Sequence, residues 1–395
     1  MWNRNVTTLW LAQLISYMGD AVYQLALIWL IFDITDSSVV TGIVAMSAYL
    51  PAIIFGLLGG VFADKYNRLR IMHIANVSQS LTVIIIPITL YYGVADAMLL
   101  GLLAFVRSSF GTLFPPALNA FIPEVVDKKG LTKVNSINAT SMQLAYLLGP
   151  AVAGVLLGII SVSKLFIFDA FSFLGASFLL LFVVKKRKPP LRESHATFSQ
   201  LKSGFIYIIQ HRSIGYLILL TILNNIFIMG PAIVGMPILV KSVLDGTASD
   251  FAFVEAGMAG GMLMGSWFVY RFSHRFNNGL LLLIGLLWDG ITYTFFYWVP
   301  SVPVAIVMIV IHGIGIPVIT ITRTAIIQRN TPNEYHGRLF SMVHLAIVGM
   351  TALSSALVGI LASLMPVPVV FLIFGIGAFV SGLIGLMSSK LRRLN

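Results

Sequence analysis

Long apolar runs recur at near-regular intervals from one end of this chain to the other. Each run has about 20 residues or more, the length that an α-helix needs to cross the hydrocarbon core of a bilayer. The runs lie near residues 6–32, 38–62, 71–92, 98–122, 137–160, 163–184, 214–240, 250–271, 279–299, 302–325, 339–364 and 367–388. Hydrophobic residues make up 58% of the chain and charged residues only 10%, whereas soluble domains carry about 25% charged residues. We therefore predict an all-α membrane protein with 12 transmembrane helices.

The basic residues lie almost entirely in alternate gaps between these runs. If the amino terminus is cytoplasmic, only Lys164 and Lys241 fall in outer gaps. The outer gaps carry acids instead, namely Asp33, Asp36, Asp96, Asp245 and Asp250. Because cytoplasmic gaps are enriched in Lys and Arg, we expect both termini to be cytoplasmic. A net charge of +11 could suggest a nucleic-acid partner. Such a partner needs basic residues gathered on one surface, whereas here they lie in the short gaps between the runs, so we predict no nucleic-acid partner.

The longest interruption divides the chain into three parts. Residues 1–184 and 214–395 are expected to form two six-helix bundles, joined by a linker over residues 185–213. The linker opens with the basic stretch 185–190 and continues with apolar residues at helical spacing, which are Phe198, Leu201, Phe205, Ile208 and Ile209. This pattern predicts an amphipathic helix on the inner membrane surface, in contact with membrane lipids. A solvated linker with a frayed helix is the alternative.

Six spans on each side of the linker raise the possibility of internal duplication. A shift of 205 residues places Asp20 on Asn225 and Arg107 on His312. The ionised positions of the first half are thus replaced by neutral or weakly basic groups in the second half. We expect two pseudo-symmetric bundles.

A charged turn follows the second apolar run, and it resembles the loop signature of the major facilitator superfamily. The matching residues are Gly60, Ala63, Asp64, Lys65 and Arg68, while Asn67 stands where Gly is usual and Leu69 where a base is usual. The resemblance implies the major facilitator fold. It also implies a cytoplasmic gate made by Gly60, Asp64, Lys65 and Arg68, in which Asp64 can pair with Arg68 one turn further on. Simple positive-inside anchoring is the alternative.

Two ionisable residues lie deep within the first half. Arg107, within Arg107-Ser108-Ser109-Phe110-Gly111, matches the superfamily's intramembrane Arg motif, and its position in the fourth run places it about 14 Å from the outer end. Asp20 lies about 18 Å deep in the first run by the same rise. Because intramembrane ionisable residues usually mark a transport pathway, we predict an Asp20–Arg107 pair in which Asp20 takes up the coupling proton. A structural ion pair that locks two helices is the alternative.

Small residues recur on three of the predicted spans. Gly149, Pro150 and Gly154 resemble the Gly-Pro motif of exporters in the superfamily, and the direction of transport is implied by that resemblance alone. Gly257, Gly261 and Gly265 form a stripe at every fourth position, as do Gly56 and Gly60. Such stripes let helix backbones approach closely, and we expect both to lie at the interface between the two halves, with dimerisation as the alternative.

Several polar residues within the spans are candidates for lining a substrate cavity. They are Gln13, Tyr17, Gln24, Gln143, Tyr146, Asn224, Asn225, His312 and His344. Three further acids, Asp169, Glu255 and Asp289, lie in predicted spans. Asp289 lies on the ninth span, which the resemblance places at the periphery of its bundle.

The sequence excludes several classes of function. It contains no cysteine, no phosphate-binding loop, no cluster with metal-ligand spacing and no nucleophile with a base and an orienting group. We therefore predict no enzyme activity, no metal and no cofactor. The isolated charges also differ from the rings of like polar groups that channels use.

The segments 12–20 and 328–338 resemble the branch of the superfamily that includes macrolide-efflux proteins, the enterobactin exporter and the lysophospholipid transporter. Taking these observations together, we predict a monomeric exporter of amphipathic small molecules in the bacterial cytoplasmic membrane, driven by proton antiport and working by alternating access. Sodium is the alternative coupling ion. A lipid transporter or flippase of the same fold and a non-transporting membrane receptor or scaffold remain the alternatives for function.

Overall fold

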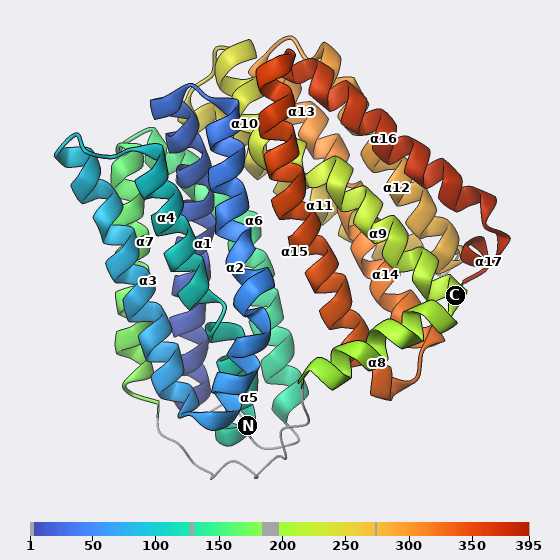
Figure 1. Ribbon diagram of the computed structural model, residues 1–395, viewed down its shortest axis with the longest axis horizontal. Helices are drawn as coiled ribbons and strands as arrows, with labels where there is room; N and C mark the ends of the chain where they lie inside the picture. The colour runs from blue at the N-terminus through green and yellow to red at the C-terminus, as the bar shows by residue number, and fades with distance from the viewer. Residues whose placement is uncertain (1–3, 127–129, 184–196, 273–274, 395) are drawn as a thin grey trace. The chain divides into compact units, whose positions relative to one another are not determined.

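The structure is a computed structural model that describes residues 4–126, 130–183, 197–272 and 275–394. Within these residues, 12 helices are long and apolar enough to cross a membrane (Figure 1). The predicted all-α class and the predicted 12 spans are confirmed. The cytoplasmic placement of both termini stays a prediction.

The helices of the first half account for six spans. They are α1 (Arg4–Thr35), α2 (Ser38–Lys65), α3 (Arg68–Tyr91), α4 (Ala97–Gly111), α5 (Phe114–Val125), α6 (Leu131–Leu157) and α7 (Val162–Leu180). Helices α4 and α5 form one span, over Ala97–Val125. The break between them comes directly before Pro115 and Pro116, which have no backbone N–H to continue the helical hydrogen bonds.

The remaining helices begin with α8, which lies in the predicted linker. They are α8 (Thr197–Gln210), α9 (Arg212–Gly230), η2 (Pro231–Gly235), α10 (Met236–Ile238), η3 (Leu239–Val243), α11 (Ala248–Phe272), α12 (Asn278–Phe295), η5 (Phe296–Trp298), α13 (Val302–Gly313), α14 (Gly315–Asn330), α15 (Asn333–Leu364), α16 (Val367–Met387) and α17 (Ser389–Arg392). Two spans are interrupted. The span from Arg212 to Val243 changes to π-helical geometry at Pro231, and the span from Val302 to Asn330 breaks between Gly313 and Gly315.

The chain forms two compact units. The first comprises Met1–Thr35 and Ser47–Thr197, and the second comprises Asp36–Met46 and Phe198–Asn395. The predicted bundles 1–184 and 214–395 with the linker 185–213 stay a prediction. The basic start of that linker lies outside the described residues.

In the first unit, α1 packs against both α6 and α7, while α3 packs against α4, α5 and α7. Two close approaches position α1. A side chain at Gly19 would overlap Ser172 and Asp169 of α7, and a side chain at Gly149 of α6 would overlap Ala21. The absence of a side chain at these glycines therefore lets the acids of α1 and α7 lie close together.

In the second unit, α12 packs against α16, α14, α13 and α9, and α11 packs against α13. The expectation for the stripe of Gly257, Gly261 and Gly265 is wrong. A side chain at Gly261 would overlap the carbonyl of Val310, and one at Gly265 would overlap the carbonyl of Ile314. The stripe therefore lets α11 approach the span formed by α13 and α14 within the second unit, instead of lying between halves.

Helix α8 has two contrasting faces. Tyr207 is buried and stacks on Tyr335 of α15 and on His211, whereas Phe205 and Ile209 are exposed. The predicted amphipathic character of this helix stays a prediction. Its placement on the inner membrane surface stays a prediction.

Candidate functional site

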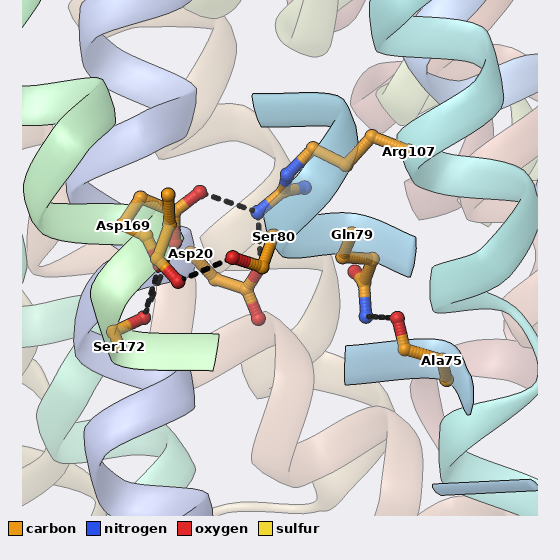
Figure 2. Close-up of polar contacts among 8 residues, drawn as sticks. Asp20, Ala75, Gln79, Ser80, Arg107, Asp169 and Ser172 are labelled. Carbon is orange, nitrogen blue, oxygen red and sulfur yellow. Dashed lines mark hydrogen bonds and ion pairs between the residues drawn. The ribbon is translucent and has the colours of Figure 1, made fainter. Parts of the chain in front are cut away.

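The first unit places Asp20 and Arg107 in direct contact. Asp20 lies on α1 and Arg107 on α4, and the guanidinium Nη2 of Arg107 donates a hydrogen bond to Oδ1 of Asp20 (Figure 2). Arg107 is buried, and the Asp20 side chain keeps 23% of its surface exposed. The structure thus brings together the two side chains predicted as a pair, and their role in coupling stays a prediction.

A third ionisable residue belongs to the same cluster. Asp169 of α7 is fully buried, and its Oδ2 lies 3.3 Å from Nη2 of Arg107. The hydroxyl of Ser172 lies 2.8 Å from the carbonyl oxygen and 3.4 Å from Oδ1 of Asp169, as Figure 2 shows. Asp169 carried no predicted role, although its depth of about 10 Å from Val162, close to that of Arg107, would have been a usable signal.

Aromatic rings complete the surroundings of the guanidinium. Its central carbon lies 3.7 Å from the ring centre of Tyr23 and 5.2 Å from that of Phe173. Contacts of this kind stabilise a desolvated cation by about 1–2 kcal/mol. They fix Arg107 between the two acids without adding another charge.

The charges of this cluster do not cancel when all three groups are ionised. Among the side chains that the structure describes, no other cation lies within ion-pairing distance of Asp20 or Asp169. Two carboxylates and one guanidinium carry a net charge of −1, and one added proton makes the cluster neutral. Because an unbalanced charge in a low-dielectric interior is costly, this arrangement favours the uptake of one proton.

The predicted gate residues have different surroundings from those expected. Arg68 donates to Oε1 of Glu124 at 2.6 Å and to the carbonyl oxygens of Ala120 and Ala63, both at 3.2 Å. Glu124 is buried on α5, and sequence reasoning missed it as a partner. The Asp64 side chain lies outside the described side chains, so its pairing with Arg68 stays a prediction.

The departure of Asn67 from the superfamily pattern has a local structural reason. Asn67 is the N-cap of α3, and its side-chain oxygen accepts from the backbone N–H groups of Leu69 and Arg70. Such a cap satisfies donors that have no partner inside the helix. Lys65 ends α2 with an exposed side chain, and Gly60 lies within α2 one helical turn earlier.

The exporter-type motif lies on the buried side of α6. Gly149 contacts Ala21 of α1, Pro150 lies inside the helix, and Gly154 is buried. The motif therefore contributes a close helix contact next to the helix that carries Asp20. The transport direction implied by this motif stays a prediction.

The candidate cavity residues are divided between the two units, and their role as a cavity lining stays a prediction. In the first unit, Gln13 is buried and accepts a hydrogen bond from the Tyr17 hydroxyl at 3.0 Å, while Gln24 is exposed. The side chains of Gln143 and Tyr146 lie outside those described. In the second unit, Asn225 donates to the carbonyl of Thr221 at 2.8 Å, and His344 is exposed. The other two candidates, Asn224 and His312, form part of a cluster.

This cluster surrounds Asp289 of the ninth span, and the placement of that span at the periphery of its bundle stays a prediction. Asp289 of α12 is 2% exposed, and its Oδ2 accepts from Nδ2 of Asn224 at 3.1 Å. Its Oδ1 lies 3.9 Å from Nδ1 of His312 on α13, and that nitrogen lies 2.8 Å from the hydroxyl of Thr292. The acid is buried because α9, α13, α14 and α16 all pack against α12.

Twelve membrane-length helices in two compact units, with a buried group of ionisable side chains within each, define a polytopic membrane transport protein. The described residues contain no group of three or more acids and histidines that could hold a metal ion. The chain belongs to the transmembrane secretion effector family of the major facilitator superfamily, whose family model matches residues 2–395. It is a multi-pass protein of the bacterial inner membrane, and it belongs among transporters, not enzymes.

Three relatives show what the chain is similar to. It is 26% identical to macrolide efflux protein A of Streptococcus pyogenes, over 86% of this chain and 85% of the relative. It is 22% identical to multidrug efflux pump Tap of Mycolicibacterium fortuitum, over 97% and 95% of the two chains. It is 24% identical to the staphyloferrin A transporter of Staphylococcus aureus (strain NCTC 8325 / PS 47), over 91% of this chain and 90% of the relative.

Solved structures share the fold. The nucleoside transporter NupG superposes with a TM-score of 0.78 at 14% identity, over 98% of this chain and 99% of that chain. The bacterial homologue of the iron transporter ferroportin gives a TM-score of 0.78 at 16% identity, over 98% of this chain and 99% of that chain. The major facilitator fold predicted for this chain is confirmed.

Proposed function

We propose that this protein is a secondary active exporter of amphipathic small molecules, driven by proton antiport and working by alternating access. The observation that carries the proposal is that two acids, Asp20 and Asp169, share one base, Arg107. A carrier coupled to protons needs a buried group that is neutral with the proton bound and charged without it. Asp20, Arg107 and Asp169 meet this requirement with a single guanidinium and two carboxylates.

Asp20 is the member of this cluster that we propose exchanges the proton. It retains surface exposure, whereas Asp169 has none. Water or substrate can therefore reach Asp20 without separating α1 from α7. Asp169 is then the permanently ionised partner of Arg107, so that loss of the proton from Asp20 leaves one uncompensated negative charge.

The substrate class is proposed from the relatives. The names of these relatives are a macrolide efflux protein, a multidrug efflux pump and a staphyloferrin A transporter, and the two efflux proteins support the outward direction. We propose cytoplasmic termini because of the distribution of Lys and Arg along the sequence, and we propose a monomeric state. We propose Gly60, Asp64, Lys65 and Arg68 as the cytoplasmic gate. The ion pair between Arg68 and Glu124 supports this proposal, because it holds one of the gate residues against α5.

The experiment is transport by the purified full chain in proteoliposomes with an imposed pH gradient. Ethidium, erythromycin and staphyloferrin A are the probes, and a lysophospholipid is included to detect lipid transport. The expected result is movement of at least one of the first three probes that stops when the proton gradient is dissipated, and that persists when a sodium gradient is removed. Transport of the lysophospholipid alone, or insensitivity to protons, would contradict the proposal.

Asp20→Asn is the decisive variant. We expect it to lose proton-driven accumulation while it still exchanges probe down a probe gradient, because the neutral amide cannot release a proton. Asp96→Asn is the matched control, since Asp96 caps α4 outside the spans and accepts from the Leu99 N–H, a role that Asn also fills. Full proton-driven accumulation by Asp20→Asn would remove Asp20 from the coupling mechanism.

A further inference from the structure

The Asp289 cluster in the second unit is not used by the proposed mechanism. Asp289, Asn224, Thr292, Tyr293 and His312 are all at most 8% exposed. They come from three helices, α12, α9 and α13. Burying an acid and a histidine within the membrane costs free energy, so such residues usually have a function.

Three oxygens of this cluster have no hydrogen-bond partner. They are Oδ1 of Asp289, Oδ1 of Asn224 and the hydroxyl of Tyr293. Buried polar atoms are almost always hydrogen-bonded, so an unpartnered group calls for an explanation. A proton on the carboxyl group, or on the imidazole that lies 3.9 Å from it, would supply the missing donor.

His312 is the ionisable side chain that lies within ion-pairing distance of Asp289. Among the described side chains of the helices packed against α12, no Lys or Arg forms an ion pair with Asp289. The ring of Tyr293 on α12 packs against that of His312 with ring centres 4.3 Å apart. The other acids in the unit's spans are Asp250 and Glu255 on α11 and Glu334 on α15. The further titratable or basic groups of these helices are Arg323 and Arg329 on α14, Arg212 and Tyr216 on α9, Tyr297 on η5, and Arg392 on α17. Helix α16 contributes none.

Charge balance sets the number of protons that this pair holds. An ionised Asp289 beside a neutral imidazole leaves a buried charge of −1. One proton, on either group, makes the pair neutral overall. The pair is thus analogous to the cluster around Arg107, and a shift of 205 residues places Arg107 on His312.

We propose that Asp289 and His312 form a second proton-binding site, which takes up and releases one proton in the second unit. The proposal deepens the proposed function, on which its use in transport rests. A proton fits this site better than a metal cation does, because one carboxylate and one imidazole supply fewer ligands than protein metal sites use, and the described residues contain no group of three or more such side chains. The amide of Asn224 holds Oδ2 at 3.1 Å and leaves Oδ1 turned toward the imidazole.

The first experiment needs no substrate. Infrared difference spectra of the purified full chain in lipid, recorded across a pH series, report the carbonyl stretch of protonated carboxyl groups. We expect a band that disappears as the pH rises and that is absent from Asp289→Asn. The band should remain in Asp20→Asn and in the matched control Asp245→Asn, because Asp245 is an exposed loop residue with φ 52°, a conformation that Asn also adopts.

His312→Gln tests the role of the imidazole. Without it the proton has only the carboxyl group to occupy, so the band should persist to higher pH than in the wild type. A merely structural histidine would leave the pH dependence unchanged. A spectrum in which the wild type and Asp289→Asn agree, or a band of Asp289 that does not change with pH, would overturn the proposal.

The second experiment tests whether this proton is used in transport. With the membrane potential clamped at zero, one exchanged proton supports about a tenfold probe gradient per pH unit, and two support about a hundredfold. We expect the ethidium gradient of the wild type to fall from about a hundredfold to about tenfold in Asp289→Asn. If the wild type ignores the pH gradient, the proposed function fails, while the infrared result still decides the proton site. If the wild type responds and Asp289→Asn accumulates equally, the second site has no part in coupling.

Discussion

Arg107→Met removes the one cation that the described side chains place against Asp20 and Asp169, and its cost can be worked out from the structure. Asp20 and Asp169 both contact the same guanidinium nitrogen. Removing one partner of a buried ion pair typically costs about 3–5 kcal/mol, because the other charge is left uncompensated. The lost contact with the Tyr23 ring, at 3.7 Å, adds about 1 kcal/mol. We expect the free energy of unfolding to fall by about 4–6 kcal/mol.

The assay is thermal unfolding of the detergent-solubilised protein, followed by the monodisperse fraction on size exclusion. Arg107→Met should unfold at a clearly lower temperature than the wild type. The same substitution combined with Asp20→Asn and Asp169→Asn should recover at least half of the loss, because the site is then free of charge. The shape change at residue 107 is identical in both variants, so the difference between them isolates the charge effect.

Two results would refute this reasoning. If Arg107→Met is as stable as the wild type, the two acids are not held ionised by the guanidinium. If the triple variant is no more stable than Arg107→Met, packing of the long Arg side chain decides the stability, and the charge argument for proton uptake loses its basis.

Two further predictions concern contacts that sequence reasoning missed. Glu124→Gln should lower the unfolding temperature through a loss of about 1–3 kcal/mol, because Arg68 keeps a hydrogen-bond acceptor but loses its buried counter-charge; an unchanged unfolding temperature would show that the pair contributes nothing. Gly261→Leu should abolish the monodisperse protein peak, since the side chain would overlap the carbonyl of Val310, whereas Gly260→Leu should not, because nothing lies within 4 Å of its Cβ position. Equal behaviour of the two glycine variants would contradict the assigned packing face.

Much of the site was accessible from the sequence, and the rest depended on which helices pack together. The depths of Asp20 and Arg107 follow from the rise of a helix, so their pairing could be expected. Asp169 has a similar depth, but nothing local shows that α7 lies directly against α1. The close contact at Gly19 places it there.

The second unit shows the same limit more clearly. The sequence predicts His312 as a cavity-lining candidate and gives Asp289 no role, because its ninth span is expected at the periphery of the bundle. The structure places both within one buried cluster. The packing of α9, α13, α14 and α16 against α12 decides this, and the sequence of α12 by itself does not show which helices cover the face that carries Asp289.

The amino-acid sequence by itself determined the number of spans and the helical class, because bilayer thickness and the need to satisfy every backbone hydrogen bond leave few options for runs of this length. It also predicted that ionisable groups lie deep in the first half. Only the tertiary structure decided that Arg107 binds two acids, that Arg68 binds Glu124, and that Asp289 lies beside His312. The physical reason is that hydrophobicity sets which segments enter the membrane, whereas close packing at small residues sets which faces meet.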